Sequence, residues 1–254
     1  MSPESRAPGE VRAPHPPLPE YYADEAARHG WVRAIFDRTA PDYTRVEQLM
    51  AFGTGGRYRR QALLRAGLKP AMRVVDVGTG TGLVAREAVH VLGDASAVVA
   101  IDPSAGMLRH AKLPNGTALL EGIAERLPLR DQCADFLSMG YALRHVSDLS
   151  ATFAEFYRVL KPGGIVCLLE ITRPAGRVGA ALLKAYLRGV VPTLARMVAR
   201  TREMPQLMSY YWDTIEACVP PEQVTLALAE AGFAEIARHV ELGLFSEYRA
   251  MKPA

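Results

Sequence analysis

Short apolar runs alternate with segments of helical periodicity along most of the chain. Five runs have the length and composition of buried strands: Val74–Val77, Ala97–Ile101, Thr117–Leu120, Ala134–Met139 and Ile165–Ile171. Helical spacing of apolar residues marks three segments between them: Leu83–Leu92, Ser104–Lys112 and Leu149–Leu160. Strands that alternate with helices predict a doubly wound α/β domain whose parallel sheet is covered by helices on both faces.

The C-terminal part of the chain predicts a different closure of this sheet. A helix over Pro221–Ala231 has Gly232 as its stop signal, and strands follow near Ala234–Val240 and Leu244–Met251. A turn at Gly243 would join these two strands as a hairpin. The expected fold is therefore α/β, with a mostly parallel seven-stranded sheet that ends in an antiparallel hairpin.

Three further segments flank or interrupt this pattern. Residues 1–19 hold six prolines and predict a disordered tail, because proline fixes φ and donates no backbone hydrogen bond. Residues 20–68 predict an N-terminal helical cap. The main domain then spans 69–254, with a helical lid inserted at about 173–219. This lid is basic, since no acidic residue occurs from 173 to 202.

Composition narrows the class of protein. The chain has 254 residues, of which 49% are hydrophobic and 22% charged, as in ordinary globular domains. A formal net charge of +3 without any dense Lys/Arg tract does not indicate nucleic-acid binding. The three cysteines are far apart and show no metal-binding spacing, so neither a disulfide framework nor a metal site is expected. With no apolar segment typical of a signal peptide or a membrane span, the expected location is cytoplasmic.

The most specific motif is the glycine-rich loop that follows the first strand. Asp76, Gly78, Gly80 and Gly82 alternate in the stretch Asp-Val-Gly-Thr-Gly-Thr-Gly. Glycines let the backbone turn tightly and approach a ligand closely. In a doubly wound sheet, ligands bind at the carboxyl ends of the strands, which is where this loop lies.

The spacing of the loop selects among nucleotide-like ligands. A dinucleotide fingerprint would need a third glycine where Leu83 stands, and no Gly-Lys-Ser/Thr of a phosphate loop follows. A carboxylate at Asp76 would repel a phosphate and favour the ammonium or sulfonium of S-adenosylmethionine. Asp102 ends the next strand, where a carboxylate can accept hydrogen bonds from both ribose hydroxyls. A glycine-rich turn without a ligand is the alternative.

The same motifs carry a resemblance to a known family. From about Phe36 to Lys252 the chain resembles the ubiquinone/menaquinone-biosynthesis C-methyltransferases, a branch of the Rossmann-like class I methyltransferases. The stretches that carry it are Val74–Gly82, Asp102–Leu108, Ala124–Pro128, Tyr141–Val146, Arg158–Gly164, Leu169–Pro174 and Ala231–Phe233.

The resemblance implies S-adenosylmethionine as cofactor and assigns residues to it. Asp76, Gly78, Gly80 and Thr81 would hold the methionine part, Asp102 the ribose, and Met107 and Ala124 the adenine, while Tyr43 would cover the cofactor. Neighbouring positions complete the expected cofactor site: Thr79, Pro103, Ile123, Glu125 and Met139.

Three stretches depart from the family pattern. Ile123 stands where the family usually has Asp or Asn, which deprives the adenine amine of a side-chain partner. The family's Ser-Phe-Gly-Leu-Arg-Asn-Val is here Gly-Tyr-Ala-Leu-Arg-His-Val over 140–146, and its C-terminal His-Arg-Gly is Tyr-Arg-Ala over 248–250. These changes leave the identity of the acceptor open.

Two side chains after the fourth strand are candidates for catalysis. Arg144 could stabilise the phenolate of a hydroxylated ring, or could instead pair with Asp148 at a helix start. His145 could accept a proton near neutral pH, or could be a loop histidine bonded to the backbone. Glu170 and Cys167 are more typical of an ion pair and of the core. The Met204–Met208 and Tyr210–Trp212 stretches could line an apolar pocket or pack the lid.

The expected activity is C-methylation of a small hydroxylated aromatic or quinol, with or without an isoprenoid tail. The alternatives are an O-, N- or C-methyltransferase of secondary metabolism, and a cofactor-binding scaffold without turnover. The basic lid, with Lys184 and Arg188 one turn apart, could rest on anionic lipid at the inner membrane surface, or could be a solvated face. The oligomeric state is left open.

Overall fold

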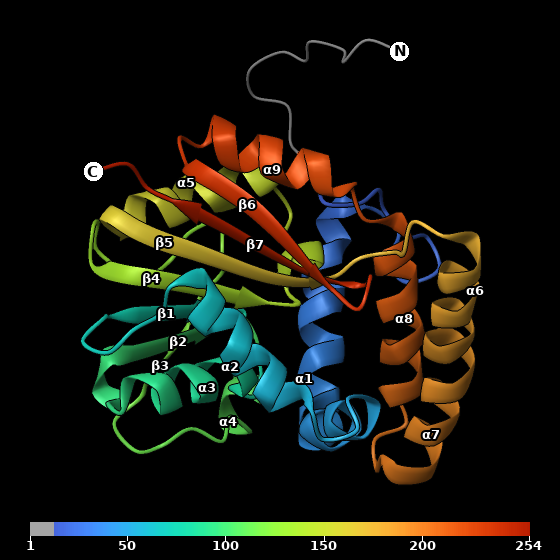
Figure 1. Ribbon diagram of the computed structural model, residues 1–254. Coiled ribbons are helices and arrows are strands. Elements are labelled where there is room, and N and C mark those ends of the chain that lie inside the picture. Colours follow the sequence, from blue (N-terminus) through green and yellow to red (C-terminus); the bar gives the residue numbers. More distant parts are fainter. Residues whose placement is uncertain (1–12) are drawn as a thin grey trace, which may run out of the picture.

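The computed structural model describes residues 13–254 and contains one seven-stranded sheet in the order β3-β2-β1-β4-β5-β7-β6 (Figure 1). Its strands are β1 (Val74–Val77), β2 (Val98–Asp102), β3 (Ala118–Glu121), β4 (Ala134–Gly140), β5 (Leu160–Ile171), β6 (Ala234–Glu241) and β7 (Phe245–Met251). The first five are parallel, and β7 pairs antiparallel with both β5 and β6. The predicted fold class is confirmed, including the closing hairpin.

Alternate side chains of the central strands point to opposite faces of the sheet and pack in two separate hydrophobic cores. Val75, Leu137 and Val166 face α5 (Leu149–Val159) and α9 (Pro221–Glu230), whereas Val74 and Phe136 face α2 (Gly55–Ala66) and α3 (Leu83–Leu92). This period-two alternation, with mostly apolar side chains on both faces, is what a sheet covered on both faces requires.

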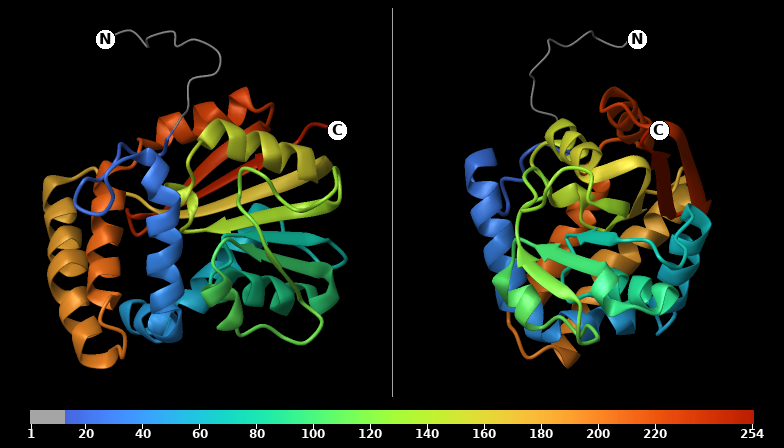
Figure 2. Two further views of the ribbon diagram at one scale, coloured as in Figure 1. Left: turned by 180° about the vertical axis from the view of Figure 1, so that it is seen from behind. Right: turned by 90° about the vertical axis from the view of Figure 1, so that its left-hand side faces the viewer.

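A third core lies beside the sheet rather than on either of its faces (Figure 2). It joins the long helix α1 (Glu25–Met50) to α6 (Arg177–Ala185), the π-helical segment η3 (Tyr186–Val190), α7 (Val191–Val198) and α8 (Met204–Ala217). Asp24 caps α1 by accepting a hydrogen bond from the Ala27 amide at 2.8 Å. Three short helices complete the described elements: η1 (Ala95–Ala97), α4 (Ala105–Arg109) and η2 (Leu143–His145).

Three expectations from the sequence need correction. Residues 13–19 are not a disordered tail: Pro14 and His15 are buried, and the Pro14 carbonyl accepts a hydrogen bond from the Val219 amide at 2.7 Å. Residues 1–12 of that expected tail lie outside the described part. Strand β5 begins at Leu160 rather than Ile165, because Leu160 already pairs with Ala134 ahead of a bulge. One continuous helical stretch, residues 177–198, is also long and apolar enough to cross a membrane by length and composition, where the sequence predicted no such run.

Candidate functional site

A cavity of about 900 Å³ lies at the carboxyl edge of the parallel strands, between the sheet and α1. The ends of β1, β2 and β4 form its floor, and α1, the stretch 121–128, the segment 141–146 and one residue of α8 form its wall. A volume of this size is at the upper end of the usual range for small-molecule sites, roughly 300–1,000 Å³. The predicted cofactor loop and the predicted catalytic segment therefore meet in one cavity.

The glycine loop has the backbone that its sequence requires. Gly78 and Gly80 both line the cavity and have φ values of +65° and +56°. A Cβ on Gly78 would lie 2.6 Å from the Ala142 Cβ, whereas a Cβ on Gly80 would meet nothing within 4 Å. The space beside Gly80 is therefore open for a ligand, which fits a loop that must let the methionine part of S-adenosylmethionine approach the backbone.

Asp76 lies behind the loop rather than in the cavity lining. Its carboxylate accepts hydrogen bonds from Thr79 Oγ1 at 2.7 Å, Ser138 Oγ at 2.6 Å and the Ala85 amide at 3.2 Å. Burial raises the pKa of Asp76 to about 6. The side chain thus ties the glycine loop to β4 and to the start of α3, and its negative charge acts on a ligand from beneath the loop.

Asp102, unlike Asp76, lines the cavity. Its two oxygens accept hydrogen bonds from the Gly80 and Ser104 amides at 2.7 and 2.8 Å, which fixes the carboxylate between the two cofactor loops. Burial raises the pKa of Asp102 to about 6. An ionised carboxylate has about four acceptor positions, so two remain for ribose hydroxyls.

The remaining expected cofactor residues divide into two groups. Six line the cavity together with Tyr43: Pro103, Met107, Ile123, Ala124, Glu125 and Met139. Thr79 and Thr81 are buried behind the glycine loop, where Thr81 Oγ1 accepts a hydrogen bond from Thr44 of α1 at 2.8 Å. The apolar lining, the carboxylate of Asp102 and the open space at Gly80 together fit an adenosine with a cationic tail.

Helix α1 closes the cavity through contacts that the sequence did not reveal. The Asp37 carboxylate accepts hydrogen bonds from Ser104 Oγ at 2.6 Å and from the Gly106 amide at 2.7 Å. A Cβ on Gly106 would lie 2.7 Å from the Asp37 Cα, so only glycine permits this approach. The Tyr43 and Tyr211 hydroxyls share a hydrogen bond of 2.6 Å and both rings line the cavity. Asp37 therefore holds α1 onto the loop that carries Asp102.

His145 stands at the other end of the cavity among aromatic rings. It lies edge-on to Phe36 and stacks on Tyr210, with ring centroids 5.2 and 5.4 Å away. Its Nδ1 lies 3.3 Å from the Tyr210 hydroxyl, and its buried Nε2 has no hydrogen-bond partner in residues 13–254. Burial, together with the charge of Arg144, lowers the pKa of His145 well below its usual value. The imidazole is therefore neutral at physiological pH, and its Nε2 can accept a hydrogen bond in the tautomer whose ring proton is on Nδ1, facing the Tyr210 hydroxyl.

Arg144 does not line the cavity, and its ion-pair partner is not Asp148, the alternative that the sequence offered. The guanidinium bonds Glu170 through Nη1 and Oε2 at 2.6 Å, and both side chains are buried, with 1% and 6% of their surface exposed. Asp148 instead caps α5 by accepting a hydrogen bond from the Ser150 amide at 2.7 Å. The Arg144 guanidinium also lies 5.0 Å from the centre of the Tyr211 ring. Arg144 thus reaches the cavity only through Tyr211 and through its neighbour His145.

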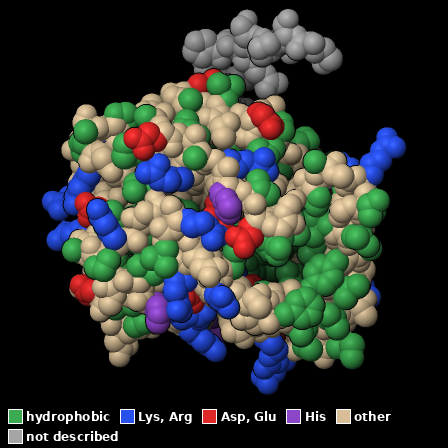
Figure 3. All heavy atoms as spheres, in the orientation of Figure 1, with side chains coloured by type: hydrophobic (Ala, Val, Ile, Leu, Met, Phe, Trp, Pro, Cys, Tyr) green, Lys and Arg blue, Asp and Glu red, His purple; other side chains and the backbone are tan. Residues whose placement is uncertain are grey.

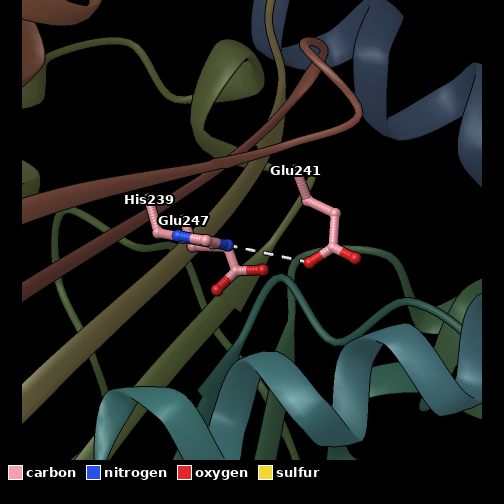
Figure 4. A group of neighbouring side chains, drawn as sticks. All are labelled: His239, Glu241 and Glu247. Atoms are coloured by element: carbon pink, nitrogen blue, oxygen red, sulfur yellow. Dashed lines mark ion pairs between the residues drawn. The ribbon is translucent and has the colours of Figure 1, made fainter.

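A second group of polar side chains lies on the β6–β7 hairpin, away from the cavity lining (Figure 4). Potential ligand atoms of His239, Glu241 and Glu247 lie within 4.8 Å of one another. Arg65 already bonds both carboxylates, with 3.0 Å to Glu241 and 2.5 Å to Glu247. Because this guanidinium already pairs with both carboxylates, we assign no metal to the group of His239, Glu241 and Glu247.

Comparisons with known proteins match most of the chain to methyltransferases. The model of the ubiE/COQ5 methyltransferase family matches residues 23–252. The ubiquinone/menaquinone biosynthesis C-methyltransferase UbiE of Campylobacter jejuni is 32% identical over 209 residues, covering 78% of this chain and 87% of that protein. UbiE of Syntrophotalea carbinolica is 33% identical over 218 residues, covering 83% and 88%.

Solved structures show the same fold at lower identity. A methyltransferase of Thermotoga maritima, described as a possible histamine N-methyltransferase, superposes with a TM-score of 0.60 at 23% identity and covers 86% of this chain and 98% of its own. Phosphoethanolamine N-methyltransferase 2 of Haemonchus contortus, in complex with S-adenosyl-L-methionine, gives a TM-score of 0.62 at 18% identity and covers 87% and 60%.

Proposed function

The chain belongs to the ubiE/COQ5 methyltransferase family, whose members are S-adenosylmethionine-dependent enzymes, and from that premise we propose that it methylates a ring carbon of a small quinol-type acceptor. The relatives named UbiE, which match most of the chain, support this substrate class. The observation within the structure that carries the proposal is His145, which lines the cavity and whose buried Nε2 has no hydrogen-bond partner among residues 13–254.

The cofactor end of the cavity positions the methyl donor. S-Adenosylmethionine, when bound, supplies a methyl group on a cationic sulfur that is already activated for displacement. Asp102 accepts the ribose hydroxyls, and Gly80 leaves room for the methionine part. Helix α1 covers both loops through Asp37 and Tyr43 and excludes water. Holding the two reactants in line can supply several kcal/mol of the barrier reduction, on the order of 7–11 kcal/mol at best.

The part of the cavity around His145 binds and activates the aromatic ring of the acceptor. Phe36, Tyr211 and the imidazole of His145 offer apolar faces and edges against which an aromatic ring can pack. His145 Nε2 accepts the proton of the acceptor hydroxyl, which sends electron density to the adjacent ring carbon that forms the new bond. The protonated imidazole then returns this proton to the ring oxygen, and His145, neutral again, takes the proton of the methylated carbon, so that the ring regains its aromatic form. General-base catalysis of this kind typically contributes about 10²–10⁴-fold.

The test is a transfer assay with cofactor labelled in its methyl group and a panel of soluble short-chain quinols and small phenols. We expect label on a ring carbon of a quinol, located by NMR of the extracted product. Label on oxygen would favour an O-methyltransferase, and label in no compound despite measurable cofactor binding would favour a scaffold.

Two histidine variants test whether His145 is the catalytic base. His145→Gln removes the basic nitrogen and should lower turnover by about 10²–10⁴-fold. The affinity for S-adenosylhomocysteine should stay within twofold, because His145 contacts none of the cofactor loops. His239→Gln, on the exposed hairpin, is the matched control. Full activity in the His145 variant would remove the base from the mechanism.

The enzyme's place in the cell is part of the same proposal. An acceptor that carries an isoprenoid tail resides in the bilayer, so an enzyme of this class must meet it there. We propose that the protein is cytoplasmic and docks peripherally on the inner face of the membrane through its helical lid. The oligomeric state forms no part of the proposal.

A further inference from the structure

The outer face of α6, η3 and α7 carries a stripe of exposed apolar side chains. Val178, Leu182, Val190 and Met197 are 74%, 67%, 47% and 77% exposed. Their spacing of one, two and two helical turns places them on one side of the helical stretch 177–198. Figure 3 shows hydrophobic side chains gathered over the side of the molecule that α6, α7 and α8 form. We refer to these four residues as the outer stripe.

The opposite side of the same helices belongs to the folded core. Ala180, Leu187, Val191 and Ala195 are buried, and most of them pack in the core shared with α1 and α8. Apolar residues thus surround the helices, which is why their composition passes as a membrane span. Withdrawing the stretch into a bilayer would expose the core formed with α8. The structure is compatible with a helix pair that lies on a membrane rather than one that crosses it.

Charge identifies the kind of partner. Seven basic residues and no acidic one occur from 173 to 202. Lys184 and Arg188, the pair that the sequence singled out, are also exposed but form ion pairs with Glu216 and Asp213 of α8 at 3.6 and 3.8 Å. Arg177 and Arg196 are exposed directly beside Val178 and Met197, and neither forms an ion pair with any residue in the part of the chain described. The free positive charge therefore borders the outer stripe.

We propose that the outer stripe, bordered by Arg177 and Arg196, docks on a bilayer that contains anionic lipids. Val178, Leu182, Val190 and Met197 enter the headgroup boundary, and the two guanidinium groups bind phosphates beside them. The exposure of the outer stripe and the charge of the two arginines beside it are observed in the structure and do not depend on the proposed function. The choice of a lipid surface gains support from the proposed isoprenoid acceptor and to that extent rests on the proposed function.

A second copy of the chain fits this surface less well. A twofold interface would bring the same patch of each copy face to face. It would then place Arg177 and Arg196 of both copies at one contact, with no acidic residue from 173 to 202 to compensate. Like charges held together in this way oppose association, whereas an anionic membrane complements them.

The experiment is co-sedimentation of the full chain with vesicles of phosphatidylglycerol and phosphatidylcholine, compared with phosphatidylcholine alone. Wild type should bind the anionic vesicles and should release as salt rises, because the screening length falls to about 10 Å at 0.1 M. The double variant Leu182→Asp/Met197→Asp should bind at least about tenfold more weakly. Arg177→Gln/Arg196→Gln should lose about fivefold for each charge and most of the salt dependence.

The control variant is Leu226→Asp, which alters a half-exposed leucine of α9 on another side of the molecule. It should bind vesicles as wild type does. Wild type that ignores anionic vesicles, or binding lost equally in the control, overturns the proposal. A wild-type dimer that Leu182→Asp/Met197→Asp converts to a monomer, without vesicle binding in either, assigns the stripe to self-association instead. Turnover on a soluble acceptor should be unchanged in all these variants, so absent turnover would count against the proposed function and not against the membrane surface.

Discussion

Replacing Arg144 separates a structural from a catalytic role for the buried ion pair. In Arg144→Met, the Glu170 carboxylate keeps its hydrogen bond from the Leu143 amide at 2.9 Å but loses the 2.6 Å bond to the guanidinium. Breaking a buried pair by removing one partner typically costs about 3–5 kcal/mol, because an uncompensated charge is left behind. We expect a loss of this size in the free energy of unfolding at pH 7.5.

The loss should depend on pH in a direction that the structure fixes. Burial raises the pKa of Glu170, and Arg144 opposes that shift. Without Arg144 the folded-state pKa of Glu170 rises further above its unfolded value. A carboxyl with a raised folded pKa destabilises the fold more as pH rises, by up to about 1.4 kcal/mol for each pKa unit. Arg144→Met should therefore be less destabilised at pH 5.5 than at pH 7.5.

The double variant Arg144→Met/Glu170→Gln completes the cycle. It removes both charges, and the Gln side chain can still accept the Leu143 amide, so most of the lost stability should return. Urea unfolding and turnover should be measured on the same preparations. If Arg144 only positions Tyr211 and the His145 segment, turnover recovers with stability. Recovery of stability with turnover still about 10²–10³-fold low would assign Arg144 to the acceptor itself. A loss below about 1 kcal/mol in Arg144→Met would refute the reasoning about the buried pair.

Three further outcomes test the cofactor end. Asp102→Ala should weaken S-adenosylhomocysteine binding several-fold or more by calorimetry, since charge-assisted hydrogen bonds are worth about 1.5–3 kcal/mol each; unchanged affinity would remove Asp102 from the ribose. Burial raises the pKa of Asp102 to about 6, so the affinity of wild type for S-adenosylhomocysteine should be constant above pH 7 and should fall below pH 6 as Asp102 becomes protonated. Asp102→Asn, which has no carboxyl to titrate, should lose this part of the pH dependence. Gly80→Ala places a Cβ in the cavity and should weaken cofactor binding. Gly93 is the control, because it has a similar positive φ and equally open surroundings but lies outside the cavity lining. Gly93→Ala should therefore lose comparable stability and still bind the cofactor normally.

The cofactor loops could be predicted from the sequence because their requirements are local. Gly78 and Gly80 need positive φ, and Asp102 ends its strand one residue before a proline, so each signal lies within a few residues. The strand–loop–helix pattern then places these residues at one edge of the sheet. Their exact contacts did not follow, since Asp76 turned out to bind the loop from behind rather than to line the cavity.

The rest of the site depends on contacts between distant segments. Asp37 and Tyr211 lie on helices whose periodicity shows an apolar face but not what that face meets. Gly106 was a signal in principle, because a glycine inside a short helix can mark a close approach, yet nothing in the sequence identified Asp37 as the residue that approaches it. Arg144 shows the same limit: Asp148 was the nearest acid along the chain, and Glu170, 26 residues away, was the nearest in space.

The charges around His145 bear on the kind of acceptor it can serve. Arg144 and Arg28 lie close enough for their positive charges to lower the pKa of the imidazole, and burial lowers it further. A carboxylate in this position would pair with those arginines and become a poor base, whereas a neutral imidazole keeps its lone pair available. The lowered pKa also makes His145 a weak base, so it can deprotonate only a rather acidic hydroxyl. A phenol, with a pKa near about 10, meets that condition and an aliphatic alcohol does not. Among hydroxylated acceptors, the electrostatics around His145 therefore favour an aromatic ring over an alkyl alcohol.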